Sequence, residues 1–515
     1  MSEESLGVLG EMCMAASSPE EMRSVSGVLN DLILWSRDDQ YASQVLTEVI
    51  QPALRKTERR VLFFHLYGWL YGGAERAITS VANHLSHKYR VVVSVFEPVE
   101  NASFHLGPEV ALVPLYGNRD RVDRLVSLVR LISPDVFVGN NNSIPEFVGI
   151  YRDLRSLGIK SVAYNHEYYF YPHNHKELYP SVVERNRALA HASAACFLTT
   201  FSANAYALVN RNAAIMPNPN TFPVQNSHFN PGRKTILAVG RFSDPIKRVD
   251  RLLDAFYLVS EAHPDAKLVV VGPYNLDARV PFDSPETVGD ILRRRHLDED
   301  RVTFVGQQEE VSSYYEEADA FVLTSENEGF GMVLTEAGSF GLPSVLFSVP
   351  GLDDIIVDGV NGFIVPQGDV GAMAERLSKI LGDVDLRRRM SEAARHLVGR
   401  FAIERVGARW EELISLILTS NNAKTIEEGL SLKFMTSVSD YGTFLRLVAG
   451  ELESTAIKCA RWGGDRGVVP YTSVKAAAEK LSFNLRNHGL KATARKAGRT
   501  LLGMTRERLI TGKWW

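Results

Sequence analysis

Short apolar runs alternate with helical patterns through the first half of the chain. VLFFHL (61–66) leads into a glycine-rich stretch and the helical pattern AERAITSVANHLSH, and RVVVSVFE follows. The alternation continues through DVFVGN (135–140), KSVAYNH (160–166), AACFLTT (194–200) and the short run AAIMPNP. Buried strands separated by helices are typical of β-α-β units, so this pattern predicts a parallel sheet covered by helices.

The same pattern restarts at Lys234. Its apolar runs are TILAVG, KLVVVG, RVTFVG, ADAFVLTS, PSVLFS and GFIVP, and the join at 218–233 is rich in Asn and Pro. We therefore predict an α/β protein with two Rossmann-like doubly wound domains, one over 59–220 and one over 221–400. Ligands of such sheets bind beyond the carboxyl ends of the strands, and two facing sheets create one cleft between the domains.

The two ends of the chain carry opposite charge. Residues 1–58 hold ten acidic and four basic residues, and their apolar spacing predicts a helical N-terminal extension. Residues 421–515 predict a basic helical C-terminal extension, with ten Lys and Arg against two Glu from Lys475 onward. Residues 490–501 form a basic amphipathic pattern, which predicts peripheral membrane contact through 474–515. The open alternative is a basic helix that packs on the acidic extension or stays solvated.

The overall composition is that of an ordinary globular protein. The 515 residues are 45% hydrophobic and 23% charged with a net charge of −4, which excludes a collagen, a disordered chain and a polycation for nucleic acid. Cys13, Cys196 and Cys459 form no CxxC pair, so neither a zinc nor a disulfide framework is expected. The N-terminus has no apolar signal core, and no apolar run approaches the ~18–20 residues that cross a bilayer. We expect a cytoplasmic protein, located at the inner face of the membrane if the tail binds there.

The first chemical motif is Glu328-Gly329-Phe330-Gly331, with Glu336 eight positions after Glu328. It lies between a predicted strand and a predicted helix, where glycines let backbone N–H groups approach a phosphate at the positive end of the helix. Glu328 can accept from sugar hydroxyls, and Glu336, about one turn into the helix, can accept from a ribose diol. The alternative is that Glu336 caps the helix and the glycines serve only the turn.

Two further motifs also follow predicted strands. Arg241 and Lys247 flank the loop after TILAVG, and paired cations suit a diphosphate because charge-assisted hydrogen bonds are strong. The alternative is a solvated, salt-bridged loop. Gly72 and Gly73, in YGGAER, can bring the backbone against the same diphosphate or simply form a turn. Neither GxGxxG nor GxxxxGK is present.

The last motif is His166 at the end of the strand KSVAY. Its imidazole can donate to a sugar hydroxyl or polarise the reacting centre, although a lone histidine is often structural. A metal site built from His166, Glu167, His173 and His175 is not predicted, because their spacing matches no known zinc site. The string 298–300, Asp-Glu-Asp, follows a helix end and predicts a surface turn.

Together these motifs resemble the retaining glycosyltransferases of family 4, which have the GT-B fold. The resemblance covers residues from about 60 to about 420. It is carried by these strings: GGAER (72–76), His166, GRFSDPIK (240–247), the Glu328 and Glu336 pair within SENEGFGMVLTEAGSFGLP, and VDGVNGFIVP (357–366).

The resemblance implies roles for the motif residues. Arg241 and Lys247 would hold the nucleotide diphosphate and stabilise it as it leaves. Glu328 would contact donor-sugar hydroxyls, Glu336 would bind the ribose, and His166 would lie beside the donor sugar.

Backbone groups complete the implied donor site. Gly72 and Gly73 would close over the phosphates. The amides of Phe330, Gly331 and Met332 would lie near the donor sugar. The base would stack near Gly272-Pro273 and the loop 306–311, and a helix over 401–420 would cross back to the first domain. The sequence departs from the family in having Asp353-Asp354 where Gly-Gly and a later Glu are frequent, and a long aromatic segment at 167–180.

The chemistry of the motifs leads to the same reaction. Negative charge builds on a leaving diphosphate, and Arg241, Lys247 and a helix N-terminus can stabilise it. No Asp or Glu is placed as a nucleophile, so we expect same-face transfer with retention, in which the leaving phosphate takes the acceptor proton. We predict a metal-independent hexosyltransferase with a nucleotide-diphosphate sugar donor and no other cofactor. Its acceptor would be a glycan or lipid-linked molecule in polysaccharide or glycolipid biosynthesis.

Two alternatives remain open at this point. One is a nucleotide-sugar epimerase or a phosphorylase on the same fold, although no lysine signature for pyridoxal phosphate is present. The other is a non-catalytic binding protein with a basic tail. Nucleic acid is not an expected partner, because the tail has no interleaved aromatic residues for base stacking.

Overall fold

The computed structural model describes the central part of the chain as two units. The described residues are 59–66, 72–96, 105–115, 121–140, 146–166, 179–206, 210, 212–226, 229–280 and 284–420. Unit 1 ends at Pro217 and resumes at Gly407, and unit 2 runs from Asn218 to Val406. The expected extensions 1–58 and 421–515 lie outside the described residues, as do His173 and His175.

Unit 1 is built on a parallel sheet with the order β3-β2-β1-β4-β5-β6-β7. Its strands are β1 (Val61–Leu66), β2 (Arg90–Val95), β3 (Val110–Pro114), β4 (Val136–Gly139), β5 (Lys160–Asn165), β6 (Ala194–Phe197) and β7 (Ala213–Ile215). The structure confirms every strand predicted here. It adds β3, whose sequence VALVP is short and ends in proline. Proline is tolerated there because β3 is an edge strand.

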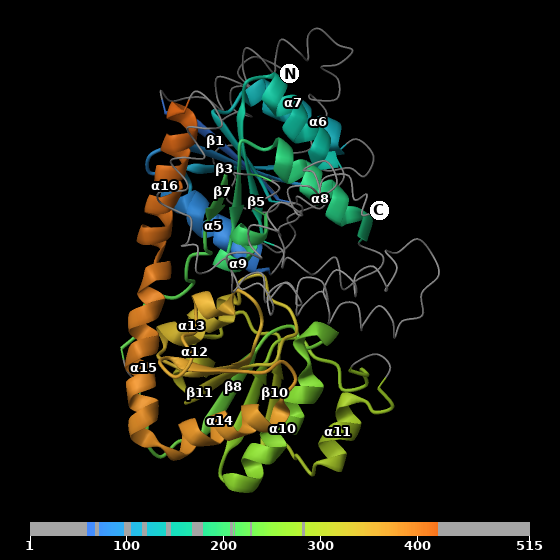
Figure 1. The fold of residues 1–515 in the computed structure, drawn as a ribbon, viewed down its shortest axis with the longest axis vertical. Helices are drawn as coiled ribbons and strands as arrows, with labels where there is room; N and C mark the ends of the chain where they lie inside the picture. Colours follow the sequence, from blue (N-terminus) through green and yellow to red (C-terminus); the bar gives the residue numbers. More distant parts are fainter. Residues whose placement is uncertain are drawn as a thin grey trace, which may run out of the picture. The chain divides into compact units, whose positions relative to one another are not determined.

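Helices cover both faces of this sheet (Figure 1). They are α5 (Gly73–Leu85), α6 (Arg121–Ile132), α7 (Glu146–Ser156), α8 (Tyr179–His191), α9 (Thr200–Tyr206) and the C-terminal part of α16 (Ile403–Thr419). Side chains alternate across β1, so His65 meets Phe147 of α7 while Phe64 faces α16. On the α16 side, the fully buried Trp410 packs against Phe64 and Tyr164, with ring centroids 6.0 and 5.0 Å away.

Unit 2 has a parallel sheet with the order β10-β9-β8-β11-β12-β13. Its strands are β8 (Thr235–Val239), β9 (Lys267–Val271), β10 (Val302–Gly306), β11 (Ala320–Leu323), β12 (Ser344–Phe347) and β13 (Gly362–Val365). All six were predicted from their apolar runs. Two interior strands, β11 and β12, are buried on both faces, which explains why they read as continuous apolar sequence.

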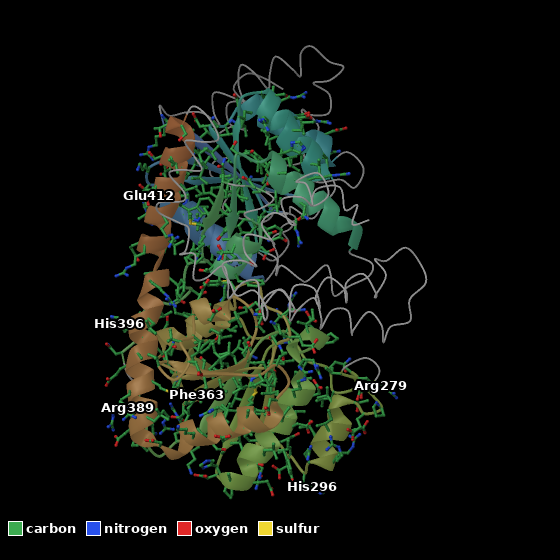
Figure 2. The ribbon with its side chains drawn as sticks, in the orientation of Figure 1. Arg279, His296, Phe363, Arg389, His396 and Glu412 are labelled. Carbon is green, nitrogen blue, oxygen red and sulfur yellow. The ribbon has the colours of Figure 1, made fainter. Side chains whose placement is uncertain are left out.

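The helices of unit 2 also form two layers around their sheet. They are η4 (Pro245–Lys247), α10 (Val249–Ala262), α11 (Val288–Arg294), α12 (Ser312–Glu316), α13 (Met332–Ser339), η5 (Leu352–Asp354), α14 (Val370–Gly382), α15 (Val384–Val398) and η6 (Gly399–Phe401). Ala320 and Val322 join the core beneath α10 and α14, whereas Phe321 points to the other face and stacks on Tyr315 of α12. Arg389 and His396 project from α15 away from the sheet (Figure 2). Unit 2 is therefore a doubly wound domain.

Each sheet has one point where the direction of strand addition reverses. In unit 1 it lies between β1 and β4, and in unit 2 between β8 and β11. Open parallel sheets bind ligands beyond the carboxyl ends of the strands at this reversal point. Among the described residues no helix meets the length and apolarity that a membrane crossing requires.

Candidate active site

In unit 2 the loops after β8 and β11 are bound to each other at the reversal point. The backbone N–H of Glu326 donates to the Ile246 carbonyl at 2.9 Å. The Thr324 hydroxyl donates to the Lys247 carbonyl at 2.7 Å. These contacts join two motifs that are about eighty residues apart in the sequence.

The same junction brings two predicted site residues together. Lys247 Nζ lies 2.7 Å from Glu328 Oε1, and the two side chains are only 18% and 12% exposed. The stem of Lys247 passes over Gly240, where a Cβ would lie 3.8 Å from its methylene carbons. Since both groups are charged and largely desolvated, the pair holds an ammonium and a carboxylate ready at the edge of the sheet.

Arg241 lies in the same loop but is exposed, and its guanidinium makes no ion pair with any residue of the described ranges. The loop is shaped by Asp244, whose carboxylate accepts from the Ile246 N–H at 3.0 Å and caps η4. Arg241 is thus a cation on a structured loop, available to an anion that arrives from solvent.

A second ion network stiffens the base of this loop. Arg248 has the left-handed φ of 51° and binds Asp250 at 2.6 Å and Glu326 at 2.5 Å, and Arg251 lies 3.3 Å from Glu326. Burial acts to lower the pKa of Arg248, but its bonds to Asp250 and Glu326 outweigh burial and raise that pKa. Burial and the neighbouring Arg248 lower the pKa of Arg251. These cations are committed to protein carboxylates, unlike Arg241.

The glycine motif forms the start of α13, as predicted. Gly331 has φ 78° and precedes the helix, and no side chain caps the first turn. The Phe330 ring is 3% exposed and packs edge-on against Phe401, so the ring belongs to the packed interior. The first amides of α13, from Met332 on, therefore present the positive end of the helix beside the Lys247–Glu328 pair.

Glu336 lies within α13 but is 3% exposed. Its Oε1 accepts from the Thr221 hydroxyl at 2.9 Å, and its Oε2 accepts from the Tyr315 hydroxyl at 2.8 Å. The carboxylate thus binds two hydroxyls, which is the chemistry expected for a ribose diol, but here the hydroxyls belong to the protein. Its contact with ribose stays a prediction.

Gly272 marks a close approach of two loops. Its φ is 122°, and a Cβ at this position would overlap the Gly240 carbonyl. The Gly272 N–H donates to the Gly306 carbonyl at 2.8 Å, and the Ser243 N–H donates to the Pro273 carbonyl at 2.9 Å. The loops after β8, β9 and β10 are therefore held side by side along one edge of the sheet.

In unit 1, Gly72 and Gly73 form the start of α5, with Gly72 as the extended N-cap. A Cβ on Gly72 would overlap the Glu75 carboxylate, which folds back over the start of the helix. An acidic group at a helix N-terminus is favourable. The glycine pair therefore does form the strand-to-helix turn, and its contact with a diphosphate stays a prediction.

His166 directly follows β5, and its ring lies 4.1 Å from that of Tyr164. Its Nε2 is buried and has no hydrogen-bond partner among the described residues. Burial lowers the pKa of His166 to about 3, so the imidazole is neutral at physiological pH. A neutral imidazole can donate to or accept from a hydroxyl, which fits the predicted role beside a sugar and not that of a cation.

The remaining motif residues have local structural roles. Asp298 to Asp300 form an exposed turn, as predicted. Asp353 accepts from the Gly351 N–H at 3.2 Å, and the Asp354 carbonyl accepts from Arg400. Within the described ranges no group of three or more His, Cys, Asp or Glu is arranged to hold a metal ion.

Sequence reasoning missed the residues that organise the site. Thr221 and Tyr315 hold Glu336, and Thr324 and Glu326 tie the loop of Lys247. Thr324 and Glu326 lie within four residues of Glu328 in the sequence, and this closeness was the one available sign that they belong to the site. Their partners became visible only when β8 and β11, which are not consecutive strands, were placed next to each other.

Comparison with known protein families identifies the domain that carries this geometry. The model of "Glycosyl transferases group 1" matches residues 222–397. Most of unit 2 is therefore similar to this family of domains. The match contains Arg241, Lys247, Glu328 and Glu336, so the charged site described above belongs to the matched domain.

Curated relatives extend the similarity. An uncharacterized glycosyltransferase of Haemophilus influenzae is 24% identical over 371 residues, which is 69% of this chain and all of that protein. N-acetyl-alpha-D-glucosaminyl L-malate synthase of Bacillus anthracis is 33% identical over 184 residues, which is 35% of this chain and 45% of that enzyme. The stronger identity is therefore confined to less than half of the Bacillus enzyme.

A solved structure supports the two-domain fold. Anabaena HepE in complex with UDP superposes with a TM-score of 0.57 at 19% identity, covering 69% of this chain and 99% of that one. This similarity and the two Rossmann-like units show the GT-B fold. The group 1 match and the glycosyltransferase relatives show that the chain is a glycosyltransferase enzyme.

Proposed function

We propose that the enzyme transfers a hexosyl group from a nucleoside diphosphate sugar to an acceptor hydroxyl, with retention of configuration and without a metal ion, in the manner of family 4. The observation that carries the proposal is the Lys247–Glu328 pair, which lies at the reversal point of a parallel sheet in the same region as Arg241, a cation with no ion pair among the described residues. One cation, one ion pair and one helix N-terminus suit a ligand that is part diphosphate and part sugar.

The pair supplies both halves of the donor site. When a diphosphate arrives, Lys247 can exchange the Glu328 carboxylate for a phosphate oxygen, because both acceptors carry negative charge. Glu328 is then released to accept hydrogen bonds from the sugar hydroxyls. Arg241 adds a second positive charge to the leaving diphosphate, and the first amides of α13 add peptide dipoles.

If the transfer retains configuration, the state of the carboxylates supports same-face transfer over a double displacement. Glu328 is proposed to accept hydrogen bonds from the sugar hydroxyls, and Glu336 is buried against two protein hydroxyls, so neither carboxylate is assigned as a nucleophile. In same-face transfer the bond between the anomeric carbon and the phosphate oxygen breaks. The acceptor oxygen bonds to that carbon on the same face, and the acceptor proton passes to the leaving phosphate.

For the donor we name the nucleotide to test first, and for the acceptor we propose only a class of molecule. UDP is the first nucleotide to test, because Anabaena HepE, a protein with the same fold, was solved with UDP. For the acceptor we propose a glycan or lipid-linked molecule in polysaccharide or glycolipid biosynthesis. This agrees with the basic sequence 474–515, for which we propose contact with the inner face of the membrane.

The reaction is tested with the full chain and a panel of UDP, GDP and ADP sugars. We expect one nucleotide series to raise the melting temperature in the presence of EDTA. We also expect the free nucleoside diphosphate to appear only when an acceptor is added. The anomeric configuration of the product, measured by NMR, should match that of the donor. Activity that strictly requires added magnesium, an inverted product, or interconversion of the donor sugar without transfer would each contradict part of this proposal.

Membrane contact is tested separately by liposome flotation. Full-length protein should float with anionic vesicles, and a variant truncated after residue 473 should not. Equal flotation of both forms would rule out the membrane role without affecting the proposed reaction.

A further inference from the structure

Unit 2 has a hollow at the edge of its sheet opposite the candidate active site. Its lining includes residues that come just before three strands: Arg233 before β8, Asp319 before β11 and Pro343 before β12. The Asp319 N–H donates to the Thr235 carbonyl at 2.8 Å, which joins the starts of β8 and β11. The hollow has a volume of about 360 Å³, part of it open to solvent. It lies at the amino edge of the sheet and is therefore separate from the charged loops at the carboxyl edge.

The charged residues that line the hollow carry an excess of positive charge. They are three arginines and two carboxylates: Arg233, Arg387, Arg395, Glu316 and Asp319. Asp319 is already bound within the protein, because its Oδ2 accepts from Arg233 Nε at 3.0 Å and from the Thr235 N–H at 2.9 Å. Glu316 is exposed, so water and salt screen its charge. The charges of Arg387 and Arg395 are therefore not fully balanced by these carboxylates.

Arg387 projects from α15 and is only 1% exposed. Its Nη1 donates to the Arg233 carbonyl at 2.9 Å, and its Nη2 donates to the carbonyls of Asn230 and Pro231, both at 3.0 Å. Asp319 Oδ1 lies 3.7 Å from Nη1, which is too long for a hydrogen bond. The remaining N–H, at Nε, is buried and has no hydrogen-bond partner in the described part of the chain. A buried donor on a cation is costly to leave unpaired, so a ligand that accepts a hydrogen bond here would be favoured.

Two more donors continue from Arg387 along α15. Ser391 and Arg395 follow it at intervals of four residues, so the three side chains form one stripe on the helix, and all three line the hollow. Gly341 makes room for them: its φ is 73°, and a Cβ there would overlap Arg395 Nη1 and lie 2.7 Å from Ser391 Oγ. Ser391 is 5% exposed, and within the described ranges neither its hydroxyl nor the Arg395 guanidinium makes a hydrogen bond or an ion pair.

An oxyanion suits this set of groups better than water does. Burial lowers the pKa of Arg395, and the nearby carboxylate of Glu392 offsets this only in part. Water can accept from the unsatisfied donors, but it cannot balance the charge of two partly dehydrated guanidinium groups. A phosphate group does both, because guanidinium and hydroxyl donors form charge-assisted hydrogen bonds with its oxygens.

We infer that Arg387, Ser391 and Arg395 form a second anion site, which binds a phosphate group, either as inorganic phosphate or as the phosphoryl end of a small phosphomonoester. The site goes beyond the proposed function and does not depend on it.

The test is calorimetric titration of the full chain with inorganic phosphate and with glycerol phosphate, in a buffer free of other oxyanions. Each titration is done in the wild-type and in the Arg241→Ala background, because phosphate can also bind at the proposed donor site. In both backgrounds Arg395→Gln should weaken binding at the second site by about 10- to 100-fold, the range of one lost hydrogen bond between charged groups. The matched control is Arg389→Gln, which should change nothing, because this arginine of α15 projects away from the sheet (Figure 2).

The two probes distinguish the sources of the phosphate group. Glycerol phosphate that binds as tightly as phosphate supports a phosphomonoester ligand. Binding of phosphate alone supports the inorganic ion.

Two results would overturn the inference. One is phosphate binding that disappears with Arg241→Ala, which would assign all of it to the donor site. The other is unchanged phosphate affinity in Arg395→Gln together with a lower melting temperature, which would mean that Arg395 only stabilises the negative end of α13. If Arg395→Gln does not fold, Ser391→Ala decides, since it should weaken phosphate binding by several-fold and an unchanged affinity would contradict the site.

Discussion

The carboxyl edges of the two sheets offer different chemistry. In unit 2 the loops at the reversal point carry Arg241 and the partly buried pair of Lys247 and Glu328. In unit 1 the described candidates are the glycine turn at the start of α5 and a neutral His166 whose Nε2 is buried. Charge stabilisation is thus concentrated in unit 2, and uncharged hydrogen bonding in unit 1.

This difference indicates a division of labour in the proposed transfer. A leaving diphosphate needs fixed positive charge, which unit 2 provides. A sugar hydroxyl needs a donor or acceptor without net charge, which a neutral imidazole provides. Four experiments test this comparison, and they follow in order of decreasing expected effect.

The largest effect is expected for Arg241→Ala. Arg241 is an exposed cation of the unit 2 loop with no ion pair in the part of the chain that the structure describes, so its loss should reduce turnover by about 10²–10³-fold, the scale of one lost donor to a developing anion. Initial rates of nucleoside diphosphate release measure the loss. Arg389→Ala is the control, because this arginine projects from α15 away from the sheet (Figure 2). An Arg241→Ala enzyme with the wild-type rate would refute the assignment.

The second prediction compares a glycine from each unit. Gly272→Ala should lower the free energy of unfolding by about 3 kcal/mol, because the new Cβ overlaps a rigid backbone carbonyl and φ is 122°. Gly72→Ala should cost less than about 1 kcal/mol, because its φ is an ordinary −105° and the Cβ meets only the flexible end of Glu75. Denaturant unfolding measures both. Equal losses would show that the close approach of the β8 and β9 loops has no special importance.

The third prediction concerns pH and His166. Burial lowers its pKa to about 3 from the ordinary 6.5, so the folded protein binds fewer protons than the unfolded chain between these values. Stability should therefore be unaffected by this group above pH 6.5 and should fall as pH drops below it, by about 2 kcal/mol between pH 6.5 and 5. The free energy of unfolding of the His166→Asn variant should not show this fall below pH 6.5. His396→Asn, on the outward face of α15, should behave like wild type, and an unchanged pH slope in His166→Asn would contradict the burial argument.

The smallest effect is expected for the coupling between Lys247 and Glu328. A double-mutant cycle of Lys247→Met and Glu328→Gln should give a stability coupling of about 1 kcal/mol, because the pair keeps some contact with solvent at 18% and 12% exposure. In the same variants donor affinity should fall more for Lys247→Met, which loses the phosphate contact, than for Glu328→Gln. A coupling of zero would mean that the two groups do not interact in solution.

Much of the fold was predictable because its signals are local. The apolar runs of β1 and β8 and the helical patterns between strands predicted two parallel sheets, and only β3, a short edge strand that ends in proline, was overlooked. Gly331, Glu328 and Lys247 were recognised because glycine and charged residues directly follow buried strands. Each of these signals lies within a few residues of sequence.

The sequence alone therefore determined the fold class and which residue types stand at the ends of the strands. Only the tertiary structure decided their partners: Glu328 for Lys247, and the hydroxyls of Thr221 and Tyr315 for Glu336. It also decided the protonation of His166, because burial is a property of the packed chain. Local signals arise from backbone geometry and hydrophobic periodicity, whereas pairing and desolvation depend on which distant strands become neighbours.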